Sequence, residues 1–542
     1  MPGGSPETLR PFLWRAANLF PDTEIVSRTH AGMTRTTYAD YADAVGRLGN
    51  ALSAAGIEQG DRVATVCWNH TRHFETYFAA PNLGAQVHTV NPLLPDEHIQ
   101  YIVEDASDRL VVVDPSLAEK VAAAYDADAF ETVEQFVVVG EEVPDVGLPN
   151  AVAYDDFVTG HDADCDWPEL DGETPAGMCY TSGTTGKPKG VEYTQRMLWT
   201  HTMAALTPMG LGIDDGDVVM PVVPMFHVNA WGIPYATTAA GATHVYPGPS
   251  PDPADIARLI EDEGVTITAG VPTVWLGLLE YLADNDVDLS SLEQIYIGGA
   301  AAPESLIRQY DDLGVEVVHA WGMTEMSPIG STAKPTADLA SADYQSRLDK
   351  RGTQGQILPG LEFRVVDDDG EAIDWDGEDF GELLVRGPWV TTEYHQRPAA
   401  NETDFTDGWL RTGDIVTVTP DGYLEIVDRA DDVIKSGGEW ISSQELENAI
   451  MAHDAVSEAA VIGVPHERYQ ERPVGFVVKR ADADVDDDQL RAELGEMLAA
   501  EFPDWWEPEK YVFIDDVPKT ATGKFSKKDL REEYADETLL GE

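Results

Sequence analysis

The chain has 542 residues, with 35 basic and 98 acidic side chains and a formal net charge of -63. This length exceeds one ordinary domain, and the hydrophobic content of 43% with 13 tryptophans argues against disorder. Free nucleic acid and anionic membrane surfaces are disfavoured as partners, because so negative a surface repels them at low salt. The charge favours adaptation to a salt-rich cytoplasm, where self-repulsion is screened.

The chain lacks the features of a secreted or membrane protein. Cys67, Cys165 and Cys179 are scattered without metal-ligand spacing, so we expect inert thiols in a reducing compartment. The first 19 residues contain no apolar core of the signal-peptide type. The most apolar stretch, Val218–Pro247, is broken by polar residues, prolines and glycines, so we expect no membrane span. We therefore expect a cytoplasmic protein.

The first two thirds of the chain alternate short apolar runs with helix-like segments. A helix is predicted near 71–83, and strands are predicted at 61–67, 85–90, 109–113, 135–139, 266–268, 294–297 and 316–319. This rhythm is typical of an α/β fold with buried parallel strands. Ligands in such folds bind where the strand ends meet the loops.

The pattern changes after about residue 362. Short strands at 362–366, 381–386 and 423–427 predict a small antiparallel β unit, with turns such as Asp369-Gly370. Beyond a polar joint at 428–431, a helix from Ser443, two strands and a helix near 488–500 predict a compact α+β domain. We therefore expect an N-terminal domain over residues 1–428 and a C-terminal domain over residues 429–542.

The most informative segment is the loop Tyr180–Val191, which reads YTSGTTGKPKGV. Its glycines let backbone amides approach a ligand, its hydroxyls are short donors, and its lysines carry positive charge, which together favour phosphate binding. It is not a Walker P-loop, because Lys187 is followed by Pro188 rather than by Ser or Thr.

Lysine use supports a role in binding anions. The chain has only 12 lysines, none before Lys120, and five of them lie in the last 33 residues. We expect Lys524, which follows Gly523, to serve an anionic ligand. Lys527 and Lys528 are expected to lie on a solvated face of the last helix.

Six further segments complete the pattern. The first four are PMFHVNAW (224–231), GGAAAP (298–303), WGMTE (321–325) and GWLRTGD (408–414), and the fifth is DRADDVIK (428–435), which continues into SGGEWIS. A sixth segment, PKTATGK (518–524), lies near the end of the chain. In order and spacing the whole set resembles the adenylate-forming enzymes, which include the acyl-CoA synthetases. The resemblance covers nearly the whole chain and implies a large N-terminal domain followed by a small mobile C-terminal domain.

The resemblance assigns the catalytic groups. Thr184 and Glu325 would hold a magnesium ion (Mg²⁺) through a hydroxyl and a carboxylate, with ATP phosphate oxygens completing the shell. Lys524 would bridge the substrate carboxylate and the α-phosphate in the transition state. No protein nucleophile is needed, because the substrate carboxylate attacks ATP itself.

The resemblance also assigns the nucleotide contacts, the hinge and the acyl tunnel. The nucleotide contacts are Ser182, Gly183, Thr185, Gly186, Lys189, His227, Gly299, Trp321, Gly322, Thr324, Asp414, Arg429, Lys435 and Trp440. Asp431 stands at the hinge, where close relatives often have Lys. Trp231 would gate an apolar acyl tunnel, as in medium- and long-chain fatty acyl-CoA synthetases. Core packing remains the alternative for Trp231 and Trp440.

These assignments predict a fatty acid–CoA ligase that uses ATP, Mg²⁺ and CoA. The alternatives are an aryl or short-chain acid–CoA ligase, an adenylation module that loads a carrier protein, and a catalytically inactive binding protein. The joint presence of Thr184, Glu325, Asp414 and Lys524 argues against the last alternative. The resemblance is also compatible with a homodimer.

Overall fold

A computed structural model describes residues 7–181, 187–367, 369–437, 439–466, 468–480, 483, 485–519 and 525–534. The chain divides into two compact units. The first contains Met1–Thr181, Lys187–Glu362 and Val385–Leu410, and the second contains Ser182–Gly186, Phe363–Leu384 and Arg411–Glu542. In the part of the chain that the structure describes, no helix has both the length and the apolar composition needed to cross a bilayer.

The first unit contains a seven-stranded sheet in the order β7-β6-β5-β3-β4-β8-β9. In chain order its strands are β3 (Arg62–Val66), β4 (Gln86–Thr89), β5 (Leu110–Val113), β6 (Gln135–Val138), β7 (Ala151–Ala153), β8 (Pro175–Tyr180) and β9 (Gly190–Thr194). All neighbours are parallel except β8 and β9. Strands such as β5 are apolar and fully buried, as a parallel sheet covered on both faces requires.

A second, nine-stranded sheet has the order β16-β15-β14-β13-β12-β10-β11-β1-β2. Its strands are β1 (Glu24–Thr29), β2 (Gly32–Thr37), β10 (Val218–Pro221), β11 (Thr243–Tyr246), β12 (Ile267–Gly270), β13 (Gln294–Ile297), β14 (Glu316–Gly322), β15 (Ile329–Thr332) and β16 (Gln356–Ile357). The central strands are parallel, and β2, β15 and β16 add antiparallel edges.

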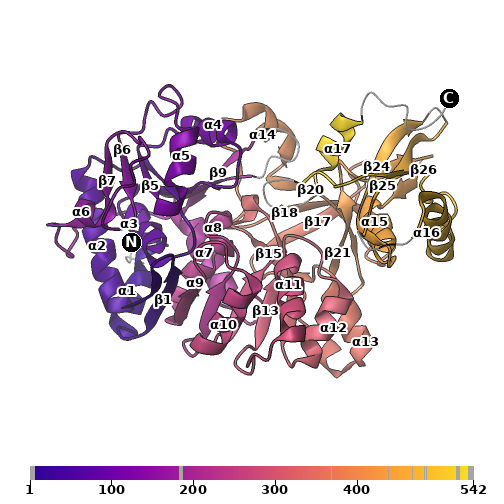
Figure 1. Cartoon of the computed structure of the whole chain (residues 1–542), viewed down its shortest axis with the longest axis horizontal. Helices are drawn as coiled ribbons and strands as arrows, with labels where there is room; N and C mark the ends of the chain where they lie inside the picture. The colour runs from indigo at the N-terminus through magenta and orange to yellow at the C-terminus, as the bar shows by residue number, and fades with distance from the viewer. Residues whose placement is uncertain are drawn as a thin grey trace. The chain divides into compact units, whose positions relative to one another are not determined.

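Helices cover both sheets (Figure 1). They are α1 (Arg10–Leu19), α2 (Tyr38–Ala54), α3 (Thr71–Asn82), α4 (Asp96–Ala106), η1 (Pro115–Leu117), α5 (Ala118–Ala124), α6 (Tyr154–Val158), α7 (Gln195–Ala205), α8 (Val228–Trp231), α9 (Ile233–Ala240), α10 (Pro253–Glu263), α11 (Pro272–Asp284), α12 (Glu304–Asp312), η2 (Thr324–Met326), η3 (Leu339–Ser341), α13 (Tyr344–Gly352) and α14 (Pro398–Asp404). Helices α3 and α9 are deeply buried, and Phe74, Tyr77 and Phe78 of α3 pack in one aromatic cluster with Tyr235 of α9.

The second unit begins with most of a five-stranded sheet. Its order is β17-β18-β20-β19 with β21 paired to β20, from β17 (Glu362–Val366), β18 (Phe380–Arg386), β19 (Phe405–Thr406), β20 (Trp409–Val418) and β21 (Leu424–Arg429). Strands β20 and β21 pair in antiparallel fashion, so that Asp414 stands opposite Arg429.

The rest of the second unit is a smaller sheet with helices. The sheet has the order β23-β22-β25-β24 with β26 paired to β25, from β22 (Ile434–Ser436), β23 (Glu439–Ile441), β24 (Val456–His466), β25 (Gln470–Lys479) and β26 (Lys510–Phe513). The helices are α15 (Ser443–Met451), α16 (Asp487–Glu501) and α17 (Lys527–Glu533). Leu446, Ile450, Leu490 and Leu494 bury the apolar faces of α15 and α16 in one core.

The predicted α/β class and the predicted strands and helices are confirmed, with ends that differ by up to about three residues. Among the strands predicted with bounds, the largest difference is the longer β14. Strand β14 extends to Gly322 and thereby carries Trp321, which the motif WGMTE placed after the strand.

Candidate active site

The two ends of the phosphate-binding loop are joined in an antiparallel hairpin. Tyr180 at the end of β8 stands opposite Gly190 at the start of β9, and Thr181 and Lys189 exchange hydrogen bonds of 2.9 and 3.1 Å. A Cβ atom on Gly190 would lie 2.4 Å from Met178 Cε and 3.2 Å from His395 Cβ, so a larger residue there would require these neighbours to shift. The expected contacts Ser182, Gly183, Thr184, Thr185 and Gly186 lie outside the described residues.

Asp105 of α4 holds the first end of this hairpin. Its carboxylate accepts a hydrogen bond of 2.8 Å from the Tyr180 hydroxyl and another of 2.8 Å from Arg397. Burial, together with the hydrogen bond to Asp105, raises the pKa of Tyr180. Tyr101, one turn earlier on α4, stacks under the Lys187 ammonium at 4.5 Å. Both ends of the loop are thus anchored on one helix.

Glu325 lies in the short helix η2, directly after β14. Its side chain is only 5% exposed, and its Oε1 accepts a hydrogen bond of 2.7 Å from the Tyr394 hydroxyl. Its carbonyl accepts a hydrogen bond of 2.8 Å from the Thr391 amide. The carbonyl of neighbouring Thr324 accepts a hydrogen bond of 2.7 Å from Tyr193 of β9. The η2 turn is therefore fixed against the strand that leaves the phosphate-binding loop.

Lys189 is also held by the segment 391–404. Its ammonium lies 2.8 Å from Asp404 and 4.1 Å from the centre of the Tyr394 ring. Tyr394 therefore contacts Glu325 through its hydroxyl and Lys189 through its ring. Two of the site residues predicted from sequence, Lys189 and Glu325, thus meet on one tyrosine that the sequence reasoning did not select.

Trp231 ends a left-handed turn that begins after His227. Val228, Asn229, Ala230 and Trp231 have φ angles of 44°, 55°, 48° and 58°. Residues other than glycine rarely adopt this conformation, which costs roughly 1–2 kcal/mol per residue. The turn places the indole beside Gly298, where a Cβ atom would lie 3.0 Å from Trp231 Cη2. Two predicted segments, PMFHVNAW and GGAAAP, therefore meet at Trp231.

Trp321 and its neighbours pack tightly at the end of β14. Trp321 is buried, and a Cβ atom on Gly330 would lie 2.5 Å from its ring. A Cβ atom on Gly322 would lie 2.1 Å from the Pro328 carbonyl oxygen. Gly299 has a φ of +80°, which favours glycine. Close packing and backbone conformation within the protein therefore explain why glycine occupies these positions.

In the second unit, the predicted ribose and phosphate contacts form an ion pair. Asp414 is buried, and its Oδ1 lies 2.5 Å from Arg429 Nη1. Lys435 and Trp440 stand opposite each other on β22 and β23, with the ammonium 4.6 Å from the indole centre. Asp431 is exposed, and its carbonyl accepts a hydrogen bond of 3.1 Å from Arg531.

The expectation that Lys527 lies on a solvated face is wrong. Its ammonium is buried, 2.8 Å from Glu447 and 2.5 Å from Ser443 Oγ, and Ser443 in turn donates to Asp428. Burial alone would lower the pKa of Lys527, but Glu447 and Asp428 raise it. Burial raises the pKa of Glu447 to about 7, against the opposing effect of Lys527. Lys524 itself lies outside the described residues.

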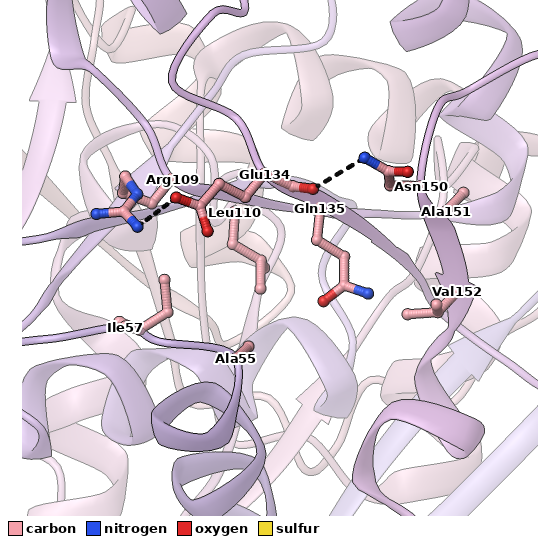
Figure 2. A pocket seen from close by; sticks show the side chains of 9 residues that line it. All are labelled: Ala55, Ile57, Arg109, Leu110, Glu134, Gln135, Asn150, Ala151 and Val152. Atoms are coloured by element: carbon pink, nitrogen blue, oxygen red, sulfur yellow. Dashed lines mark hydrogen bonds and ion pairs between the residues drawn. The ribbon is translucent and has the colours of Figure 1, made fainter.

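A cavity of about 460 Å³ lies elsewhere in the first unit (Figure 2). Its lining includes Arg109, Glu134 and Gln135, at the starts of β5 and β6, and Figure 2 shows Arg109 paired with Glu134. Ligands in parallel α/β sheets bind at the opposite, carboxyl ends of the strands. Of the predicted site residues that the structure describes, none lines this cavity.

The three cysteines agree with the expectation of inert thiols. All are free, and Cys67 and Cys179 are buried. Burial raises the pKa of the Cys67 thiol and raises that of Cys179 to about 11. Neither thiol is activated at neutral pH.

Comparison with known proteins places these features in a family. A model of the AMP-binding enzymes matches residues 13–395, and a model of their C-terminal domain matches residues 445–524. The chain is 45% identical to a long-chain-fatty-acid–CoA ligase of Thermus thermophilus, over 96% of this chain and 95% of that protein. It is 43% identical to a 3-methylmercaptopropionyl-CoA ligase of Ruegeria lacuscaerulensis and 39% identical to a medium-chain-fatty-acid–CoA ligase of Ectopseudomonas oleovorans, over 96% of this chain in each case and 96% and 95% of those proteins.

A solved structure has the same fold. The o-succinylbenzoate–CoA synthetase of Bacillus subtilis, in complex with ATP and a magnesium ion, superposes with a TM-score of 0.78 and 25% identity. The alignment covers 96% of this chain and 99% of that one. The chain therefore belongs to the family of AMP-binding enzymes.

Proposed function

We propose that the protein is an ATP-dependent fatty acid–CoA ligase. In the first step, the carboxylate of the acid attacks the α-phosphate of ATP, forming acyl-AMP and releasing pyrophosphate. In the second step, the thiol of CoA attacks the acyl carbon, forming the thioester and releasing AMP. The observation that carries the proposal is the 45% identity with a long-chain-fatty-acid–CoA ligase over nearly the whole chain.

The chain supplies the groups that the first step requires. Glu325 offers a buried, oriented carboxylate of the kind that Mg²⁺ binds, and the relative solved with ATP contains this ion. Thr184 would be the second ligand. When bound, Mg²⁺ neutralises phosphate charge. Lys524 would stabilise the charge that develops between the carboxylate and the α-phosphate.

Nucleotide binding would use glycines and side chains of several of the predicted motifs. The phosphates would contact the loop residues and Thr324, and the adenine would lie against Gly299, Gly322 and Trp321. Asp414 would accept hydrogen bonds from the ribose hydroxyls, held by Arg429 at 2.5 Å. The remaining proposed contacts are His227, Lys435 and Trp440.

The second step requires a different set of groups. We infer that the C-terminal domain, residues 429–542, rotates about Asp431, removing Lys524 from the site and opening access for CoA. The support is local: Asp431 is exposed, so its backbone can turn without disturbing a core.

Trp231 is the proposed gate of the acyl tunnel. Its indole lies beside Gly298, the residue before the proposed adenine contact Gly299, at the end of the left-handed turn. An acyl chain entering an apolar slot gains up to about 0.8 kcal/mol per methylene. Activity should therefore rise with chain length until the tunnel is full.

Pyrophosphate release across straight-chain acids from acetate to stearate, with and without CoA, tests the proposal. We expect an optimum among medium or long acids, and Trp231→Ala should shift that optimum while leaving the KM for ATP nearly unchanged. If Trp231→Ala instead loses ATP binding or folds poorly, Trp231 is a core residue. Benzoate outperforming every fatty acid would favour the aryl–CoA ligase.

A short-chain acid remains the second candidate. The specific observation in its favour is the 43% identity with a 3-methylmercaptopropionyl-CoA ligase, close to the value for the long-chain enzyme. The acid panel should therefore include 3-methylmercaptopropionate. A kcat/KM for this acid above that for every fatty acid would transfer the proposal to the short-chain class.

We also propose that the protein works in a salt-rich cytoplasm. The support is its net charge of -63, since dissolved salt screens repulsion between surface carboxylates. A homodimer remains a prediction from the resemblance.

A further inference from the structure

The segment 391–404 contacts three parts of the candidate site that lie far apart in the sequence. His395 donates its backbone amide to the Gly190 carbonyl at 2.8 Å, Arg397 pairs with Asp105, and Asp404 pairs with Lys189. Tyr394 adds the contacts to Glu325 and to Lys189. This segment therefore joins the loop hairpin to the η2 turn.

Tyr394 is fixed in place at its backbone and its ring. Asn401 accepts a hydrogen bond of 2.7 Å from the Tyr394 amide and donates one of 3.1 Å to its carbonyl. The ring is 4% exposed and packs edge-on against Phe405 at 5.2 Å. A side chain held in this way can orient its partners, because it cannot move to follow them.

We propose that Tyr394 is a positioning residue that sets the orientation of the Glu325 carboxylate and aligns it with Lys189 for binding of the metal–ATP complex. The proposal rests on the proposed function, in which Glu325 holds Mg²⁺. Tyr394 itself touches neither the nucleotide nor the reacting atoms in this scheme. Its hydroxyl acts through Glu325, and its ring acts through Lys189.

The chemistry of the two contacts supports these two roles. A phenol donates one hydrogen bond at neutral pH and carries no charge, so it fixes one carboxylate oxygen without cancelling the negative charge that a metal needs. The face of the ring is electron-rich and attracts the Lys189 ammonium. Because Lys189 also pairs through its backbone with Thr181, the ring position is transmitted to the base of the loop.

Two substitutions separate the two roles. Tyr394→Phe removes the hydroxyl and keeps the ring, so it should weaken metal binding and leave the loop in place. Tyr394→Leu removes both, so it should also weaken nucleotide binding. The matched control is Tyr310→Phe, because Tyr310 is also a buried tyrosine of the same unit, and its hydroxyl donates to a backbone carbonyl, that of Trp275 at 2.8 Å, rather than to a carboxylate.

The experiment measures Mn²⁺ binding by electron paramagnetic resonance, with the full chain saturated by α,β-methylene-ATP, whose α–β bridge cannot be cleaved to transfer AMP. Loss of an outer hydrogen-bond partner of a metal ligand typically weakens metal binding about 10- to 100-fold. We expect Tyr394→Phe to raise the Mn²⁺ dissociation constant about tenfold and Tyr310→Phe to change it less than twofold. The Mg²⁺ concentration for half-maximal pyrophosphate release should rise in parallel.

A third variant distinguishes failure of this proposal from failure of the proposed function. Glu325→Gln should abolish high-affinity Mn²⁺ binding if Glu325 is a metal ligand. If Glu325→Gln weakens binding but Tyr394→Phe acts no more strongly than Tyr310→Phe, the positioning role of Tyr394 is wrong and the metal site stands. If Glu325→Gln binds Mn²⁺ normally, the metal assignment is wrong, and the positioning role is wrong with it.

A folding defect gives a different result. It would lower the number of sites in the Mn²⁺ titration and the melting temperature, without changing the dissociation constant of the remaining sites. Asn401→Ala provides a second approach that keeps the hydroxyl and releases the Tyr394 backbone. We expect it to raise the dissociation constant about threefold, whereas an unchanged constant in Tyr394→Phe would by itself overturn the proposal.

Discussion

Two glutamates of this protein are almost equally buried, yet their surroundings differ. Glu325 in the first unit is 5% exposed and accepts a hydrogen bond from the neutral phenol of Tyr394. Glu447 in the second unit is 6% exposed and lies 2.8 Å from the ammonium of Lys527. A neutral donor orients a carboxylate, whereas an ammonium also balances its charge. The first arrangement suits a ligand-binding group, and the second suits a structural link between α15 and α17.

Exchanging the two carboxylates for amides gives the largest expected difference. Glu325→Gln should reduce adenylation about 10²- to 10³-fold, the range for loss of one transition-state charge group. Glu447→Gln should leave adenylation within twofold, because Glu447 contacts Lys527 and the Val461 amide rather than substrate groups. Pyrophosphate release at saturating substrates measures both, and equal losses would contradict the comparison.

Two lysines that are three residues apart should behave differently as well. Lys524→Ala should reduce adenylation about 10²-fold or more, while the reaction of supplied acyl-AMP with CoA survives. Lys527→Met should leave both half-reactions nearly intact and lower the stability of the second unit. Stopped-flow measurement of each half-reaction separates the two variants. An equal fall in both half-reactions for Lys524→Ala would contradict the rotation proposed about Asp431.

The pH dependence of stability should reveal the raised pKa of Glu447. Its pKa of about 7 lies above the ordinary value of 4.5, so the folded state binds the proton more tightly than the unfolded state does. The contribution of Glu447 to stability is therefore full below pH 4.5 and falls by up to about 3 kcal/mol as pH rises to 7.

Two variants test this sign. Glu447→Gln should remove the fall, so the stability of this variant should not decrease between pH 5 and pH 7 as that of the parent does. Lys527→Met should raise the Glu447 pKa further and extend the fall above pH 7. Urea unfolding of the three proteins between pH 5 and pH 8.5 measures these differences. If the free energy of unfolding of the parent, relative to that of Glu447→Gln, increases as pH rises, the sign is wrong.

Salt should change the comparison of the two glutamates least of all. It should instead change the stability of the whole chain. Surface carboxylates repel one another over about 10 Å in 0.1 M salt and over about 3 Å in 1 M salt. With a charge of -63, the melting temperature should rise by several degrees from dilute buffer to 2 M KCl. The Glu447→Gln difference should change little, because buried pairs are weakly screened. Equal melting temperatures would contradict adaptation to salt.

The sequence predicted the fold well because its elements follow local rules. Apolar runs such as Leu110–Val113 and the amphipathic helix from Ser443 specify their own structure. Gly322 also has a local structural reason, because a Cβ atom there would lie 2.1 Å from the Pro328 carbonyl oxygen.

The supporting residues were not predictable in the same way. Tyr394, Asp404, Asp105 and Arg397 act by meeting residues that lie 69 to 292 positions away in the sequence. Lys527 was misjudged because a lysine beside another lysine at a helix start is usually solvated, and the buried carboxylate that receives it comes from α15. Long-range pairing of this kind leaves no local pattern.

The left-handed turn at Val228–Trp231 carries an evolutionary consequence. Glycine adopts such angles without strain, so a chain selected for stability alone would drift towards glycine at these positions. This chain instead keeps four side chains there, including the largest one available. Mutations in the turn that relieve backbone strain should therefore also let the Trp231 indole move away from Gly298. Variants selected for heat resistance at Ala230 should consequently become less selective among acids.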